Sequence, residues 1–73
     1  MTDEIIQYLI DSEADWKFNQ TETVMHNGRT YNIIKQRMNP PAYKFAVEDA
    51  DTGDTLGKYR TIIGVITAIA NIW

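Results

Sequence analysis

Residues 22–38 read ETVMHNGRTYNIIKQRM, and the pair Asn27-Gly28 divides them into two runs. A two-residue turn of type I′ needs positive φ at both central positions, which Asn and Gly tolerate better than other residues. The flanking runs, residues 22–26 and 29–38, contain many of the β-branched and aromatic side chains that favour strands. The pattern therefore predicts a β-hairpin.

Two further strands are predicted after this hairpin. Residues 39–41 are Asn-Pro-Pro, which ends the second strand because proline donates no backbone hydrogen bond. In residues 43–48, Tyr43, Phe45 and Val47 fall on one face and Lys44 and Glu48 on the other, as in a half-buried strand. Residues 51–54 are Asp-Thr-Gly-Asp, a composition typical of a turn, and residues 55–59 form the predicted return strand. The centre of the chain thus predicts a three- to four-stranded antiparallel sheet.

A helix is predicted before the sheet. Ile5, Ile6, Leu9 and Ile10 recur at the spacing of one helix face, and Thr2 suits the N-cap position. The acidic residues after Thr2 favour the positive end of the helix dipole.

The last segment carries signals for both a strand and a helix. Its many β-branched side chains favour a strand. Ile62, Ile66, Ile69 and Trp73, however, recur at the spacing of a helix face, and Thr61 is an acceptable N-cap. We expect a helix. The order α-β-β-β-β-α then predicts one α+β domain over the whole chain, with two layers and both terminal helices on one face of the sheet.

The composition bounds the class of protein. The chain has 73 residues, a net charge of −3 and no cysteine, so it has no disulfide, thiol nucleophile or cysteine-based zinc site. The acidic first residues predict no signal peptide, and residues 62–73 fall short of the ~20 residues that span a bilayer. We therefore expect a cytosolic protein without a membrane segment. Small domains without disulfides often gain stability by oligomerising.

The sequence carries no recognisable catalytic or cofactor motif. It has no glycine-rich phosphate loop, nucleotide-binding fingerprint or pair of metal ligands. His26 is the only histidine, and we interpret it as a polar residue beside a turn. Residues 49–54 do not match a calcium loop, because the position that needs glutamate holds Arg60. We expect no enzymatic activity, no catalytic residue, no metal and no cofactor.

The predicted last helix has apolar residues around most of its circumference. Such a helix is normally buried on more than one side. In so small a domain one side can lie on the sheet, and the other needs a second copy or another protein. We predict that this interface comprises Ile63, Gly64, Ile66, Ala70, Ile72 and Trp73.

Two alternative functions arise from the charges. Arg29, Lys35 and Arg37 share a strand register with Tyr31 among them and Lys44 on the next strand, which is typical of a weak nucleic-acid platform. The net negative charge argues against that function. The carboxylates of residues 1–15 and 48–54 instead suggest a phage-type acidic inhibitor of a nucleic-acid enzyme, provided that they converge on one face.

Two aromatic residues flank Lys17. If residues 16–18 alternate as a strand does, Trp16 and Phe18 share one face, which we expect to be the core. The alternative is an exposed anchor for a partner protein, since tryptophan is favoured at interface centres.

From Asn27 onward the chain resembles the YkuJ-like family of short proteins from low-GC Gram-positive bacteria. The resemblance rests on Asn27-Gly28, the aromatic strand at residues 43–47, Tyr59, Ile62, Val65 and Ile69. It implies a leading helix, a small sheet, a closing helix and a bacterial cytosolic location. It implies no activity.

Overall fold

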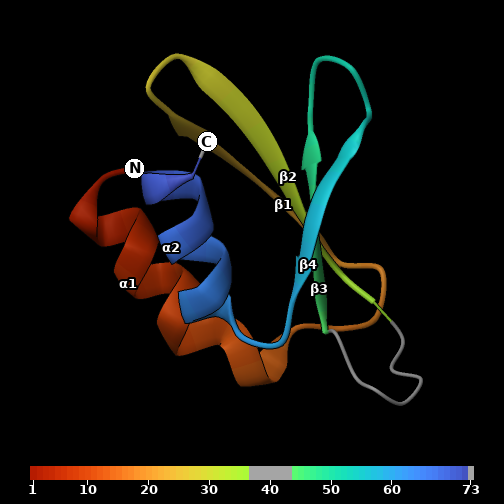
Figure 1. Cartoon of the computed structure of the whole chain (residues 1–73). Helices are drawn as coiled ribbons and strands as arrows, with labels where there is room; N and C mark the ends of the chain where they lie inside the picture. The colour runs from red at the N-terminus through yellow and green to blue at the C-terminus, as the bar shows by residue number, and fades with distance from the viewer. Residues whose placement is uncertain (37–43, 73) are drawn as a thin grey trace.

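The computed structural model describes residues 1–36 and 44–72 and has the predicted order of helices and strands. Its elements are α1 (Asp3–Ser12), a short 3-10 turn η1 (Glu13–Asp15), β1 (Thr21–His26), β2 (Arg29–Lys35), β3 (Phe45–Asp49), β4 (Thr55–Tyr59) and α2 (Ile62–Asn71). The predicted α+β class, with an antiparallel sheet and a helix at each end of the chain, is confirmed (Figure 1).

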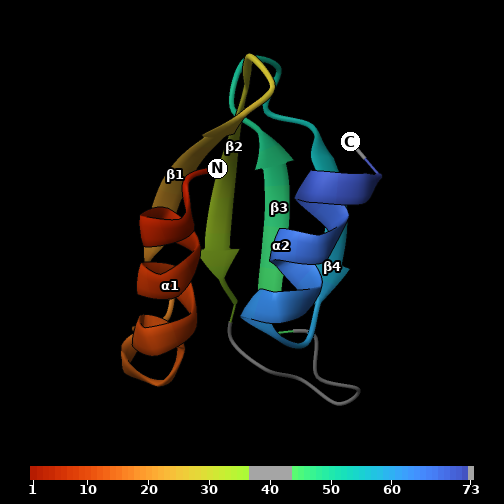
Figure 2. The same ribbon diagram turned by 90° about the vertical axis from the view of Figure 1, so that its left-hand side faces the viewer.

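The four strands form one antiparallel sheet in chain order, β1-β2-β3-β4. Both helices cover the same face of it and run in opposite directions. Figure 2 shows α1 in front of β1 and β2, and α2 in front of β3 and β4. None of the described helices lies on the other face of the sheet, which an antiparallel sheet tolerates when that face is polar.

The two hairpin turns lie at the same end of the sheet (Figure 1). Asn27 and Gly28 have φ values of 50° and 78°, as the type I′ prediction requires. In the second turn Gly53 has φ of 78°, and its N–H donates to the carbonyl oxygen of Asp49 at 2.8 Å. Asn and Gly therefore stand where the turns need a left-handed backbone.

The core lies between the sheet and the helical layer. The sheet contributes Val24, Tyr31, Ile33, Phe45 and Val47, and the helical layer contributes Leu9, Trp16, Ile62, Val65 and Ile69. The rings of Trp16 and Phe45 meet edge to face at 5.5 Å between centroids. Because alternate residues of a strand point to opposite faces, Tyr31 and Ile33 of β2 share the covered face with Phe45 and Val47 of β3, and all four are fully buried.

Both helices begin at the predicted caps. The Thr2 hydroxyl accepts a hydrogen bond from the Ile5 N–H at 3.3 Å, and the Thr61 hydroxyl accepts one from the Gly64 N–H at 3.0 Å. Each cap satisfies an N–H that the first helical turn leaves without a partner. The segment after Thr61 is therefore a helix despite its β-branched residues, because its start is capped and its apolar face packs on the sheet.

Glu13 connects the two helices. It follows the last residue of α1, and its Oε1 accepts a hydrogen bond from the Ile62 N–H at 2.5 Å. Ile62 is the first residue of α2, where a negative charge is stabilised by the helix dipole. The end of α1 is thereby fixed beside the start of α2.

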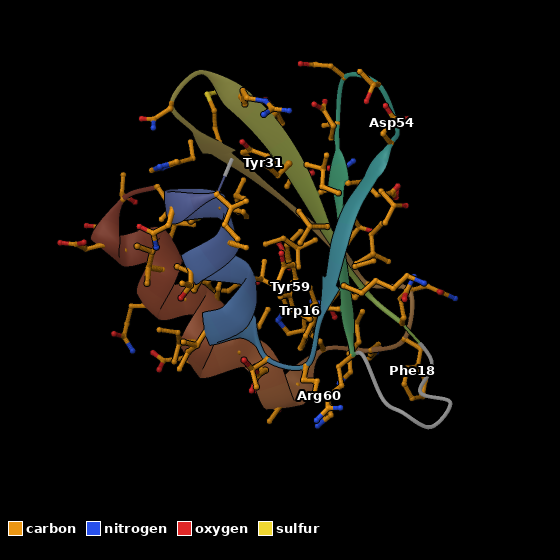
Figure 3. The ribbon with its side chains drawn as sticks, in the orientation of Figure 1. Trp16, Phe18, Tyr31, Asp54, Tyr59 and Arg60 are labelled. Atoms are coloured by element: carbon orange, nitrogen blue, oxygen red, sulfur yellow. The ribbon has the colours of Figure 1, made fainter. Side chains whose placement is uncertain are left out.

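The expectation that Trp16 and Phe18 both lie in the core is wrong for Phe18. Trp16 is buried between the layers, whereas the Phe18 side chain is 53% exposed and points away from them (Figure 3). Strand alternation does not apply here, because the Gln20 N–H donates to the Lys17 carbonyl and Asn19 has φ of 66°. This turn redirects the chain before β1.

The strand boundaries differ slightly from the predictions. β1 begins one residue earlier, β2 ends at Lys35 rather than at Met38, and β3 extends to Asp49. The proline segment and the start of the predicted third strand, including Tyr43, lie outside the described residues.

Removing the link between the helices is expected to destabilise the domain. Glu13→Ala leaves the first N–H of α2 without its carboxylate, so the free energy of unfolding should fall by about 1 kcal/mol, as for loss of a helix cap. Urea unfolding followed by circular dichroism measures the change. Asp15, an exposed carboxylate two residues further along the chain, provides a matched control. If Asp15→Ala lowered the free energy of unfolding as much as Glu13→Ala, the role given to Glu13 would be contradicted.

Candidate interaction surfaces

The outer side of α2 presents the first candidate surface. Ile62, Val65, Ala68 and Ile69 are buried against the sheet, whereas Ile63 is 62% exposed. The fold therefore buries only part of the apolar surface of α2.

The predicted interface residues lie on two different flanks of α2. A β-carbon placed on Gly64 would lie 3.6 Å from the Tyr59 side chain, so the Gly64 flank faces β4. Ile63, Ile66 and Ala70 follow the helix period on the opposite flank, which faces α1. The single interface predicted from the sequence is therefore divided.

Ile72, another member of that predicted interface, lies elsewhere. Ile72 is exposed and stands half a turn away from Ile63 around the helix. Trp73 lies outside the described residues.

α1 turns an apolar flank toward α2. The Tyr8 hydroxyl donates to Glu22 on β1 at 3.1 Å, which directs the Tyr8 flank toward the edge of the sheet. Ile6 and Ile10 lie on the other flank by the helix period. Together with α2 they form a surface that we call the interhelical strip, composed of Ile6, Ile10, Ile63, Ile66 and Ala70. Ile66 is half-buried against the core, and Ile10, Ile63 and Ala70 are exposed.

The borders of the interhelical strip differ in charge. On α1, Asp3, Gln7 and Asp11 recur every fourth residue beside the Ile6 and Ile10 row, and all three are exposed. The Gln7 amide donates to the Asp11 carboxylate at 2.8 Å.

On α2 the border has no charged side chain from Thr61 to Ile72. Its polar side chains bond back to the helix, since the Thr67 hydroxyl donates to the Ile63 carbonyl at 2.8 Å and the Asn71 amide donates to the Thr67 carbonyl at 3.0 Å. Covering this border would leave few polar groups without partners.

The described residues of the predicted basic platform, Arg29, Lys35 and Lys44, do not form it. Arg29 and Lys35 stand at opposite ends of β2, and Tyr31 between them is fully buried. The face that they share is the one beneath the helices, so the expectation of an exposed aromatic among basic residues is wrong. Lys44 is exposed before β3, and Arg37 lies outside the described residues.

Arg29 instead joins the two hairpins. Its guanidinium lies 2.7 Å from the Asp49 carboxylate and packs over the Tyr31 ring at 5.5 Å from the centroid. The Asp49 carboxylate also accepts the backbone N–H groups of Asp51 and Thr52. Arg29 first, and then these N–H groups, lower the pKa of Asp49 below its usual range. The sequence contains both residues, but only the strand register brings them together.

The acidic residues do not converge on one face. Asp11, Glu13 and Asp15 lie at the end of the helical layer where α2 begins. Asp49 and Asp54 lie at the hairpin end, and Figure 3 shows Asp54 at the β3–β4 turn and Arg60 at the opposite end. Glu13 and Asp49 are also engaged inside the fold. The surface expected of an acidic inhibitor is thus not assembled.

His26 contacts the first residue of the chain. Its Nδ1 lies 2.7 Å from the amino group of Met1, which places the start of α1 beside the first hairpin. Within residues 1–36 and 44–72, no three His, Asp or Glu side chains are grouped so that they could hold a metal ion. In the same two ranges, neither helix has the length and apolar character needed to cross a bilayer.

Comparison of the chain with protein-family models, curated proteins and solved structures finds no match. The resemblance to the YkuJ-like family therefore stays a prediction.

The Arg29–Asp49 contact predicts a pH-dependent contribution to stability. Because the pKa of Asp49 is lower in the folded than in the unfolded chain, its stabilising effect is present above about pH 4, the usual pKa of aspartate, and is lost as the pH falls through the folded value. Asp49→Asn should therefore unfold at lower urea than the wild type at pH 7, with a smaller difference at pH 3. Asp54→Asn is the control at the same hairpin. A difference for Asp49→Asn that does not change with pH would contradict this account.

Proposed function

We propose that the chain is a non-enzymatic, cytosolic protein-interaction module that binds a basic amphipathic helix of a partner protein. The observation that carries the proposal is the interhelical strip, where exposed Ile10 and Ile63 lie on facing flanks of the two helices. Two antiparallel helices with apolar side chains between them offer a surface on which a third helix can pack its apolar face.

The charges favour a basic partner. Asp3 and Asp11 border the strip on α1, the border on α2 is uncharged, and the whole chain has a net charge of −3. Lys or Arg residues of the partner could therefore lie over α1 while its apolar residues cover Ile63. Complementary charge of this kind adds mainly to specificity and to the rate of association.

The other functions considered from the sequence have less support. A nucleic-acid platform would need Arg29 and Lys35 on a common exposed surface, but Arg29 is paired with Asp49 at the far end of β2. An acidic inhibitor would need its carboxylates together, and they lie at both ends of the domain.

A synthetic helical peptide tests the proposal. The probe is a fluorescein-labelled peptide of Leu and Lys patterned as an amphipathic helix, and its anisotropy reports binding to the full chain. We expect Ile63→Asp to weaken binding about tenfold or more, because it places a charge in an apolar contact. Asp11→Asn should weaken binding less and reduce its dependence on salt.

Two controls distinguish binding at the interhelical strip from non-specific binding of the peptide. The same peptide with Glu in place of Lys should not bind, and Phe18→Asp should bind like the wild type because Phe18 lies apart from the two helices, beside Lys35 at the end of β2 (Figure 3). Equal binding by the wild type and Ile63→Asp would overturn the proposal.

A further inference from the structure

The free edge of β1 presents unused backbone groups. β1 is the first strand of the sheet, and no strand lies beyond it in the described part of the chain. The Lys35 N–H donates to the Gln20 carbonyl at 3.0 Å, which sets the alternation of the ladder with β2. Residues 22, 24 and 26 therefore bond toward β2, and the N–H and C=O groups of Thr21, Thr23 and Met25 point away from it.

β1 lacks the features by which proteins usually protect an edge strand. Such features include lysine, proline, a bulge or a very short strand. β4, at the other edge, has Gly57, Lys58 and a register shift against β3. β1 has six residues without any of these. Its single charge, Glu22, is engaged by the Tyr8 hydroxyl and the Gln20 amide.

Exposed apolar side chains lie beside the β1 edge on both faces of the sheet. On the helical side, Tyr8 is 52% exposed and bonds to Glu22, and exposed Ile5 lies one turn away on the same flank of α1. On the uncovered face of the sheet, Met25 is 62% exposed. A partner strand at β1 would therefore gain backbone hydrogen bonds and cover apolar side chains above and below the sheet.

We propose that β1 pairs with β1 of a second copy, antiparallel, about a two-fold axis at Thr23. In this register Thr23 stands opposite its own copy and Thr21 opposite the copy of Met25, so every outward N–H and C=O of the three residues finds a partner. The two sheets join into one, with the helices of both copies on the same face.

The outward groups of β1 are complementary to themselves in an antiparallel pair, which favours a second copy as the occupant. In the Thr23-centred register Glu22 stands opposite Val24 of the copy and diagonal to the copy's Glu22, and each carboxylate is already bonded to Tyr8 and Gln20 of its own chain. The contact is isologous, as in most homodimers, and closes at two copies. It uses neither Ile63 nor Ile10, so it is independent of the proposed helix-binding function.

Sedimentation equilibrium of the full chain with Thr23→Pro tests this interface. Proline removes an N–H that the fold does not use, and an edge strand tolerates it at such a position. We expect dimerisation to weaken roughly 10- to 100-fold, because two backbone hydrogen bonds across the axis are lost. Thr23→Val keeps the N–H and should dimerise like the wild type. Far-UV circular dichroism reports whether the proline variant is folded.

A single engineered cysteine gives a second readout. The chain has no cysteine, so Thr23→Cys creates one thiol per copy. Opposed Cα atoms in a hydrogen-bonded pair lie about 5.5 Å apart, within reach of a disulfide. Thr23→Cys should form a covalent dimer under mild oxidation, whereas Lys58→Cys at the other edge should not.

The outcomes separate this inference from the proposed function. Dimers in the wild type and in Ile63→Asp, with monomers in Thr23→Pro, support β1 as the interface whatever the peptide experiment gives. A monomeric wild type at high concentration, or a Thr23→Pro dimer as tight as the wild type, overturns it. Should Thr23→Pro unfold, a cross-linking yield for Thr23→Cys no higher than for Lys58→Cys overturns it as well.

Discussion

The sheet has one strongly apolar face, and the rest of the molecule is arranged to cover it. Tyr31, Ile33, Phe45 and Val47 are fully buried on this face. Each such side chain contributes roughly 1.5–3 kcal/mol when it is removed from water. All four described strands belong to one open sheet, so none of them is left to cover this face, and the helices must do so. α1 and α2 therefore pack next to each other on the same face, and within residues 1–36 and 44–72 no strand or helix covers either edge of the sheet or the outer side of the helices (Figure 2).

Local signals predicted the elements of the fold well. The turn at Asn27-Gly28 and the cap at Thr61 each depend on a few neighbouring residues, and both are confirmed. The error at Phe18 has a local cause too, because the left-handed conformation of Asn19 replaces the strand that alternation assumed.

The candidate surfaces were harder to predict, because they depend on which way each element faces. Alternation places Arg29, Tyr31 and Lys35 on one face of β2, but it does not say that the helices cover that face. The helix period likewise groups the apolar residues of α2 without saying which flank meets β4 and which meets α1. The Arg29–Asp49 ion pair depends on the register between strands 20 residues apart, which no local pattern contains. The free edge of β1 follows only from the strand order.

The contact between Glu13 and Ile62 has a consequence for how the chain folds. Each strand pairs with its neighbour in sequence, so the sheet can grow by successive hairpins at little cost in loop closure. Glu13 and Ile62 are separated by 49 residues, and their contact forms only when the chain has returned across the whole sheet. Contacts of long sequence separation are the slow ones in folding. We therefore expect closure of the two helices over the sheet to come late in folding, after the hairpins have formed.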